Sequence, residues 1–200
     1  MRNSLLILGC FAAGIAFART GWMPAALSGG LSLYALWLLI LLVGISVGSD
    51  GEWRTLLKQQ PKALFLLPVG TVLGTLAGAA AVGLLLEGRS VGECLAVGSG
   101  MGYYSLSSVL IGQSRGAELG TVALLSNLIR EMTALLLAPL LVKGFGPLAP
   151  IASGGATSMD TTLPVITRCA GKEYAVLSVF HGFCVDFSVP FLVAFFLSFA

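Results

Sequence analysis

Four ionisable side chains stand within long apolar stretches of the sequence: Arg130, Glu131, Asp160 and Asp186. An unpaired charge at the centre of a membrane costs about 2.5–3.5 kcal/mol on insertion scales, so such residues are rare unless they pair or serve a function. Carboxylates at that depth can bind a cation or exchange a proton. If these stretches cross a membrane, Glu131 and Asp160 predict a site for a cationic solute or for protons, whereas Asp186 is a weaker candidate to which we assign no role.

Asp160 is the strongest candidate because the sequence around it cannot form a regular lipid-facing helix. It lies within residues 153–164, which carry two glycines, five hydroxyl side chains and a closing proline. A helix that breaks beside a polar, protein-lined cavity can have this composition. Thr157, Ser158 and Thr161 would then join the carboxylate in a pocket for a cation. Capping of a half-helix by Ser158 or Asp160 is the structural alternative, and it is compatible with ligand binding.

A second polar group lies in the apolar stretch 120–142, at Asn127, Arg130 and Glu131. Asn127 and Glu131 are four residues apart, so they share one face of a helix, which we expect to face the interior of a bundle. Arg130 is turned by about 100° from its neighbour and therefore points toward another helix. An ion pair between Arg130 and a carboxylate of another segment, such as Asp186, is the structural alternative.

Residues 98–108 form a second predicted break. Three glycines alternate with other residues from Gly98 to Gly102, and each weakens a helix by about 1 kcal/mol relative to alanine. The hydroxyl side chains that follow, including Tyr104 and Ser105, could recapture freed backbone groups or line a path through the membrane. We therefore include these two residues in the predicted site.

The composition supports a membrane location. The chain has 200 residues, of which 56% are hydrophobic and only 10% charged, whereas soluble domains carry about 25% charged residues. The mean hydropathy is +0.95. The net charge of +2 is small, and no basic cluster suggests nucleic-acid binding. The sequence therefore predicts an all-α integral membrane protein.

The hydropathy pattern predicts about seven transmembrane segments, of which the fourth and sixth are broken by glycine. They are Asn3–Ala18, Leu31–Val47, Ala63–Leu86, Val91–Ile111, Gly120–Val142, the interrupted stretch 147–169, and Tyr174–Phe199. We expect one membrane domain, 1–200, in which residues 1–90 form a scaffold and residues 91–200 form the substrate region. In the third segment Gly70, Gly74 and Gly78 make a ridge suited to close helix packing.

Lysine and arginine are enriched on the cytoplasmic side of membrane proteins. If all seven segments cross and the N-terminus is cytoplasmic, the inside receives Arg2, Arg54, Lys58, Lys62, Arg115, Arg168 and Lys172, and the outside receives Arg19, Arg89 and Lys143. That seven-to-three distribution predicts a cytoplasmic N-terminus and an external C-terminus.

Catalytic signatures are weak in this sequence. No nucleophile–base pair, phosphate loop or metal-ligand constellation emerges, so we predict neither an enzyme nor a cofactor nor a metal site. An intramembrane aspartyl protease needs two aspartates on facing helices, and Asp160 and Asp186 supply the number without a GxGD context. His181 stands alone on an apolar stretch, where a hydrogen-bonded core histidine is the more common role.

Four motifs carry a resemblance to a known family. They are Gly102-Tyr103-Tyr104-Ser105-Leu106-Ser107, Asn127-Leu128-Ile129-Arg130-Glu131, Gly155-Ala156-Thr157-Ser158-Met159-Asp160-Thr161-Thr162-Leu163-Pro164-Val165 and His181-Gly182-Phe183. In order, spacing and surroundings they resemble the LysO-type lysine exporter family of bacteria. The resemblance implies export of L-lysine and toxic lysine analogues across the inner membrane, driven by proton exchange. Glu131 and Asp160 match the family motifs, and Asp186 does not lie in one.

Lysine chemistry agrees with this resemblance. Glu131 and Asp160 suit its two ammonium groups, while Arg130 or a half-helix N-terminus near 154–158 suits its carboxylate. A buried carboxyl group can hold a proton when lysine is absent. Export of ornithine or arginine, and a non-transporting subunit that stabilises a partner, remain the alternatives.

Members of this family carry an additional N-terminal membrane portion that resembles a repeat of the early segments here. Transporters built from repeats place their site at the repeat interface. We therefore expect a homodimer, or a separate small membrane subunit, to complete the transporter.

Overall fold

The computed structural model describes residues 61–200 continuously, together with residues 9, 10, 13, 14, 16, 17, 19, 38, 41, 42, 45, 49 and 58. The predicted segments Asn3–Ala18 and Leu31–Val47, and the polar loop that follows them, lie largely outside the described residues. The prediction of an all-α chain is confirmed in the described part, which contains helices and no strand.

Nine helical elements follow one another in residues 61–200. They are α4 (Pro61–Leu85), α5 (Val91–Gly98), α6 (Tyr104–Arg115), α7 (Ala117–Phe145), α8 (Ala149–Gly154), the 3-10 helix η1 (Gly155–Met159), α9 (Leu163–Ala170), the 3-10 helix η2 (Lys172–Tyr174) and α10 (Ala175–Leu197).

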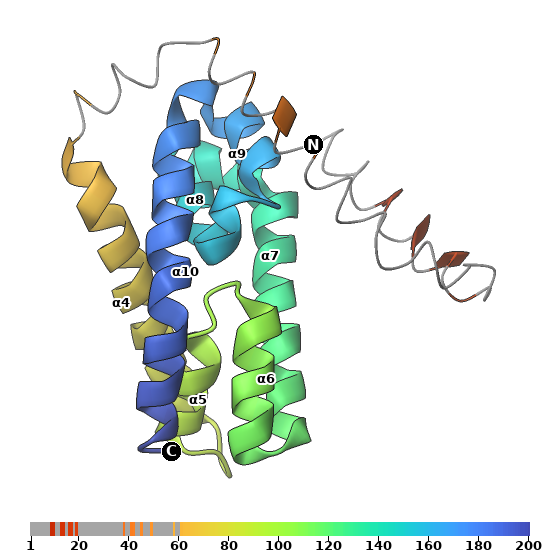
Figure 1. The fold of residues 1–200 in the computed structure, drawn as a ribbon, viewed down its shortest axis with the longest axis vertical. Helices are drawn as coiled ribbons and strands as arrows, with labels where there is room; N and C mark the ends of the chain where they lie inside the picture. The colour runs from red at the N-terminus through yellow and green to blue at the C-terminus, as the bar shows by residue number, and fades with distance from the viewer. Residues whose placement is uncertain are drawn as a thin grey trace.

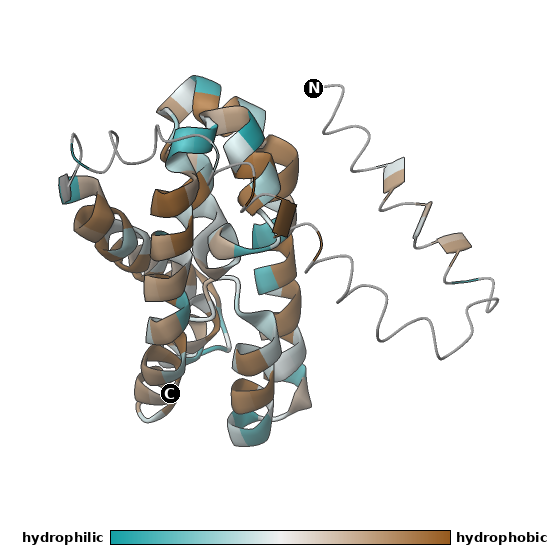
Figure 2. Cartoon of the chain, turned by 45° about the horizontal axis from the view of Figure 1, so that its top comes forward, coloured by the Kyte–Doolittle hydropathy of each residue, from teal (hydrophilic) through white to brown (hydrophobic). Residues whose placement is uncertain are grey.

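Three of these helices, α4, α7 and α10, are long and apolar enough to cross a membrane. Hydrophobic residues dominate them, whereas hydrophilic residues gather near the ends of the bundle and at a few positions within it (Figure 2). Each contains one internal proline: Pro68, Pro139 and Pro190, respectively. Membrane helices tolerate proline because neighbouring groups can satisfy the carbonyl that it frees.

The remaining helices form two hairpins that each enter from one end of the bundle and return to the same end (Figure 1). The first hairpin, residues 91–115, consists of α5 and α6, and the second hairpin, residues 149–170, consists of α8, η1 and α9. At 1.5 Å per residue, the eight residues of α5 span about 12 Å, less than half of the hydrocarbon core.

This arrangement corrects the predicted path of the chain. The sequence predicts breaks in both segments, and the structure has them, but the chain reverses at each break instead of continuing across. Residues 61–200 therefore contain three long apolar helices and two hairpins where we predicted five crossings. The predicted total of seven segments is not supported by this part of the chain.

The reversal follows from backbone conformations near the tips. Met101 has φ 43° and Gly102 has φ 100° in the first hairpin, and Gly155 has φ 63° in the second. These values lie in the left-handed region, which glycine adopts readily and which other residues rarely occupy. Met101 is nevertheless fully buried. Its carbonyl makes the contact that joins the two hairpins.

The two tips meet near mid-height, because the hairpins enter from opposite ends (Figure 1). The Ala156 N–H donates a hydrogen bond to the Met101 carbonyl oxygen at 2.9 Å. A Cβ atom at Gly155 would lie 2.2 Å from that oxygen, so only glycine fits there. The molecule thus repeats a long helix followed by a hairpin, first α4 with the first hairpin and then α7 with the second, in opposite directions.

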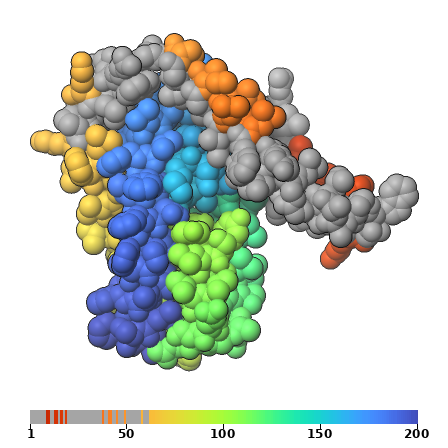
Figure 3. All heavy atoms as spheres, viewed as in Figure 1, coloured from red at the N-terminus to blue at the C-terminus, as the bar shows by residue number. Residues whose placement is uncertain are grey.

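Helix α10 follows the second hairpin and lies between α4 and α6 on the face shown in Figure 3. Its Gly182 is adjacent to η1, since a Cβ there would lie 2.6 Å from the backbone nitrogen of Met159. Helix α10 therefore packs directly against the tip of the second hairpin.

The glycine ridge on α4 has no packing partner among the described residues. No atom of the described residues lies within 4 Å of a Cβ built on Gly70, Gly74 or Gly78. Helix α4 instead meets α5 through Ala79 and Gly83, which lie against Gly98 and Cys94. The ridge lies open within the part of the chain that the structure describes.

Candidate functional site

Asn127 on α7 holds the tip of the first hairpin. Its side-chain oxygen accepts a hydrogen bond from the Gly102 N–H at 2.7 Å. Its amide nitrogen donates to the Ala123 carbonyl at 2.8 Å and, more weakly, to the Ser107 hydroxyl at 3.4 Å. Gly100 leaves the space for this side chain, because a Cβ there would lie 2.4 Å from the amide nitrogen.

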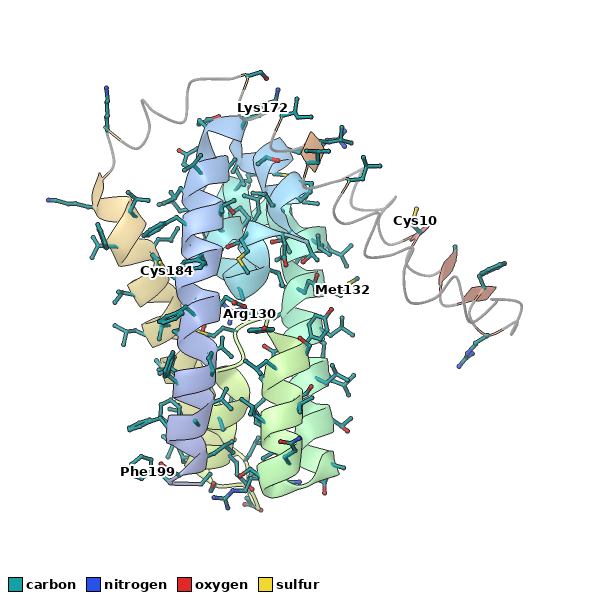
Figure 4. All side chains as sticks on the ribbon, in the orientation of Figure 1. Cys10, Arg130, Met132, Lys172, Cys184 and Phe199 are labelled. Atoms are coloured by element: carbon teal, nitrogen blue, oxygen red, sulfur yellow. The ribbon has the colours of Figure 1, made fainter. Side chains whose placement is uncertain are left out.

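Arg130, one turn further along α7, holds the second hairpin. Its Nε donates to the Ser153 carbonyl at 2.9 Å, its Nη2 to the Ala152 carbonyl at 3.0 Å, and its Nη1 to the Thr75 hydroxyl at 3.0 Å. Figure 4 shows Arg130 near mid-height, between the ends marked by Lys172 and Phe199. The guanidinium thus caps the carbonyl end of α8, where the helix dipole favours a cation.

The alternative of an ion pair between Arg130 and a carboxylate is not found. Within the described chain the ion pairs are those of Arg89 with Glu93 and with Glu118. Three of the five N–H groups of the Arg130 guanidinium donate to protein atoms. The structure therefore gives Arg130 the role of positioning the second hairpin.

Glu131 is buried on the same face of α7 as Asn127, as their spacing predicts. Its carboxylate lies within electrostatic range of Asp160 and close to the Thr161 hydroxyl. The five-residue stretch 127–131 therefore holds one hairpin with Asn127 and the other with Arg130, and points an acid toward the place where their tips meet.

A cavity of about 270 Å³ opens where the tips meet. It is lined by Gly102, Tyr103, Tyr104, Ser105, Ala156, Thr157, Met159, Asp160, Thr161 and Asp186. Five of the residues predicted for the site line this cavity: Tyr104, Ser105, Thr157, Asp160 and Thr161. Both predicted breaks thus contribute to one site, which the two hairpins and α10 enclose.

The Thr161 hydroxyl is a buried polar atom without a hydrogen-bond partner in the described structure. It lies near the carboxylates of both Glu131 and Asp160, although neither meets it in hydrogen-bonding geometry. Asp160 accepts only the N–H of Thr161 itself, at 2.5 Å. A buried hydroxyl without a partner beside two acids is the local feature expected where a polar ligand or a water completes a site.

Ser158 lies outside the cavity and has a structural role. Its hydroxyl meets the Ser178 carbonyl at 3.0 Å and His181 Nδ1 at 2.9 Å. Because the carbonyl can only accept, the single hydroxyl proton goes to Ser178, and Ser158 accepts from Nδ1–H of His181. His181 Nε2 then accepts from the Thr71 hydroxyl at 2.9 Å. Both ring nitrogens are thus bonded, which makes His181 the buried core histidine that the sequence favours.

Asp186 is the ionisable cavity residue that we did not place in the site from the sequence. It lies on the same face of α10 as Ser178 and Gly182, at successive intervals of four residues. Ser178 donates to the Ser158 carbonyl at 2.7 Å, and Gly182 contacts Met159, so this face packs against η1. The interval of four was the available signal, but it has meaning only once η1 is known to lie against this face.

Three carboxylates therefore gather around the tips: Glu131, Asp160 and Asp186. Asp160 lies within electrostatic range of the other two. None of the three has a cationic partner within ion-pair distance in the described structure. Among the described residues no three histidine, cysteine or acidic side chains lie close enough together to hold a metal ion. The arrangement can neutralise a positively charged organic group or take up protons.

The fold and the site define a class of protein. An apolar helical bundle with oppositely directed hairpins, whose broken tips enclose a polar cavity at mid-height, has the inverted-repeat architecture of many secondary transporters. The family described as "Lysine exporter LysO" has a model that matches residues 8–197. The chain belongs to this family.

Two curated relatives support that assignment. The chain is 33% identical to the lysine exporter LysO of Escherichia coli (strain K12) over 194 residues, which cover 97% of this chain and 64% of the relative. It is 32% identical to a putative lysine exporter of Haemophilus influenzae over 170 residues, 85% of this chain and 86% of the relative. The chain therefore spans less than two thirds of the Escherichia coli protein. No solved structure matches it.

Proposed function

We propose that this protein exports L-lysine, and toxic lysine analogues, from the bacterial cytoplasm across the inner membrane in exchange for protons. Family membership supports the substrate, since both relatives are named as lysine exporters. The observation that carries the proposal is the acidic cavity between the hairpin tips, which Asp160 lines and beside which Glu131 is buried.

The exchange needs only carboxyl chemistry. Lysine carries one net positive charge, and a carboxylate that pairs with an ammonium group in the loaded state can bind one proton in the empty state. Exchange of one proton for one lysine cation therefore leaves the net charge of the cavity the same in both states. Glu131 and Asp160 are the two acids to which we assign this role.

The carboxylate of lysine needs a donor away from the acids. Tyr104 and Ser105, which line the cavity, form the first turn of α6, and no side chain caps that helix start. The Tyr104 N–H already donates to the Gly102 carbonyl, so the N–H groups that follow it and the helix dipole make this N-terminus suited to a carboxylate. Residues 154–158 are less suited, because the Ala156 N–H is already bonded to Met101. We therefore place the carboxylate at the start of α6.

The orientation follows from a new count of basic residues. Because the hairpins return to their own sides, Lys62, Lys143, Arg168 and Lys172 belong to one end of the described bundle, and Arg89 and Arg115 to the other. The positive-inside rule then puts the Lys172 end in the cytoplasm and the C-terminus outside. The expected external C-terminus is retained, while Arg115 and Lys143 exchange sides.

Lysine efflux from cells that lack their own exporter tests this function. Cells that express the full chain should export labelled lysine and resist a toxic lysine analogue. Asp160→Asn and Glu131→Gln should abolish both without lowering the amount of protein in the membrane. Glu87→Gln removes an exposed acid far from the cavity and is the matched control. Normal export by Asp160→Asn, with unchanged pH dependence, would refute the exchange mechanism.

The open face of α4 supports a partner, either a second copy of the chain or a small membrane subunit. A groove of about 660 Å³ runs between α4, α5 and α7, and Gly74 and Gly78 lie in its wall. A backbone could approach closely there, because no described atom covers the glycine ridge. The alternative function, a non-transporting subunit that stabilises such a partner, rests on the same groove.

Two measurements separate these functions. The mass of the purified chain in detergent, with and without a cross-link through Gly74→Cys, reports self-association. If the chain is a transporter, neutral replacements of Glu131 and Asp160 abolish export and leave assembly intact. If it is only a stabilising subunit, they leave both unchanged. Competition by ornithine and arginine then decides which cationic amino acid is carried.

A further inference from the structure

We propose that Asp186 selects diamino acids, because together with Asp160 it receives the side-chain ammonium group of the substrate. This assignment rests on the proposed function and names the part of the site that recognises the side-chain end of the substrate. Neither the family motifs nor the sequence gives Asp186 a role.

Asp186 is placed for direct contact with a ligand. It lines the same cavity as Asp160 and Thr161. Its carboxylate makes no hydrogen bond or ion pair with any described residue, although it lies in a largely apolar helix between Val185 and Phe187. Carboxylates in such a setting are costly unless they are paired. A cation from outside the protein would supply the partner that the described chain does not.

The cavity lining fits an extended substrate. Tyr104 and Ser105, at the start of α6, line the same cavity as Asp160 and Asp186. Asp160 lies within electrostatic range of both Glu131 and Asp186. A substrate that fills the cavity therefore contacts the start of α6 and both aspartates.

This lining assigns the two ends of the substrate. The carboxylate and the α-ammonium group share one carbon, so both must lie near the α6 start. Glu131, which is buried beside the cavity within electrostatic range of Tyr104, is the acid that we assign to this ammonium group. The side chain then extends past the Thr161 hydroxyl, which has no other partner, toward Asp160 and Asp186. The distal ammonium group lies between these two carboxylates.

The pair of carboxylates also explains how other amino acids would be rejected. Norleucine has the same carbon chain as lysine but ends in a methyl group. In its complex, two like charges would face each other across a cavity from which water is displaced, which is unfavourable. Only a substrate with a second ammonium group at the right distance removes that repulsion.

Binding of labelled lysine to the purified full-length chain in detergent, with unlabelled lysine, ornithine and norleucine as competitors, tests the assignment. Asp186→Asn should weaken lysine binding by about 10- to 100-fold, the loss expected for one charged contact. The preference for lysine over norleucine should fall by a similar factor. Asp186→Glu moves the carboxylate one methylene into the cavity and should shift the preference from lysine toward the shorter ornithine. Glu87→Gln should bind all three as the unmodified protein does.

The outcomes separate this inference from the proposed function. If Asp160→Asn loses lysine binding while both Asp186 variants keep the original preferences, only the role of Asp186 is refuted. If the unmodified chain binds no cationic amino acid, or Asp160→Asn binds lysine normally, both proposals fail. Gel filtration identifies a misfolded Asp186→Asn, in which case Asp186→Glu, which keeps the charge, decides the question.

Discussion

The two hairpins follow similar paths into the bundle, but their tips are held in different ways. The tip of the first hairpin is uncharged and glycine-rich, and a neutral amide, Asn127, holds it through the Gly102 N–H. The tip of the second hairpin carries Asp160 and is held by the Arg130 guanidinium through two carbonyls of α8. The first hairpin lines the cavity with Gly102, Tyr103, Tyr104 and Ser105, whereas the second offers the acid.

This difference suggests that the two tips have different roles. Glycines in the first tip let backbone groups approach the second tip closely, as at the contact between Met101 and Ala156. The second tip must keep a carboxylate in place at membrane depth, and it has the stronger, charged anchor. The Ser158–His181–Thr71 network ties it further to α10 and α4. We therefore expect damage to the second hairpin to cost more than equivalent damage to the first.

Replacement of Arg130 should have the largest effect. Arg130→Gln leaves the part-buried carbonyls of Ala152 and Ser153 without their charged donor, at a cost of about 3 kcal/mol. Thermal unfolding of the purified protein in detergent measures the loss. Arg115→Gln is the control, because Arg115 is exposed and donates one hydrogen bond, to the Leu197 carbonyl. Equal melting temperatures for the two variants would show that the guanidinium does not hold the second hairpin.

The contact between the tips can be broken from the second hairpin by Gly155→Ala. The new Cβ would lie 2.2 Å from the Met101 carbonyl oxygen, at a φ of 63° that alanine rarely adopts. We expect a loss of about 2 kcal/mol in unfolding free energy, with weaker lysine binding because the cavity wall shifts. Gly78→Ala meets no atom within 4 Å and should be neutral or slightly stabilising in its helix. A Gly155→Ala protein as stable as Gly78→Ala would contradict the tip-to-tip contact.

The first hairpin should be more tolerant. Asn127→Ala removes the acceptor for the Gly102 N–H and should cost about 1–2 kcal/mol, less than Arg130→Gln. Asn127→Asp keeps that acceptor and should recover part of the loss. Denaturant unfolding of both variants, in the same detergent, tests this ranking. If Asn127→Ala proved more damaging than Arg130→Gln, the proposed difference between the anchors would be reversed.

The sequence predicted where the helices break but not in which direction the chain then runs. Glycines and hydroxyl side chains mark a break equally well whether the chain continues across the membrane or turns back. The direction depends on the left-handed backbone at Met101 and on the close contact at Gly155. Both are tertiary features. The count of basic residues could not reveal the reversal, because exchanging Arg115 and Lys143 between the two sides leaves that count unchanged.

The composition of the two broken stretches predicted part of the cavity lining, but not the residue that reaches the cavity from α10. Asp160, Thr157 and Thr161 line the cavity as the composition of their stretch predicts. Asp186 was left without a role because no motif surrounds it, and its face is defined only by contact with η1. Arg130 bonds to backbone carbonyls, which every residue has, so its partners could not be identified from residue types.

The smallest expected effects separate residues that stabilise the second tip from residues that contact the substrate in the cavity. Ser158→Ala removes hydrogen bonds to Ser178 and His181, so it should lower the unfolding free energy by about 1 kcal/mol. Its lysine affinity should stay within about twofold of normal, because Ser158 does not line the cavity. Thr161→Val should do the reverse. Its hydroxyl has no protein partner to lose, so stability should hold while lysine binding weakens. Unfolding and lysine binding should be measured on both variants. If the unfolding free energy and the lysine affinity fell together in each variant, this distinction would be wrong.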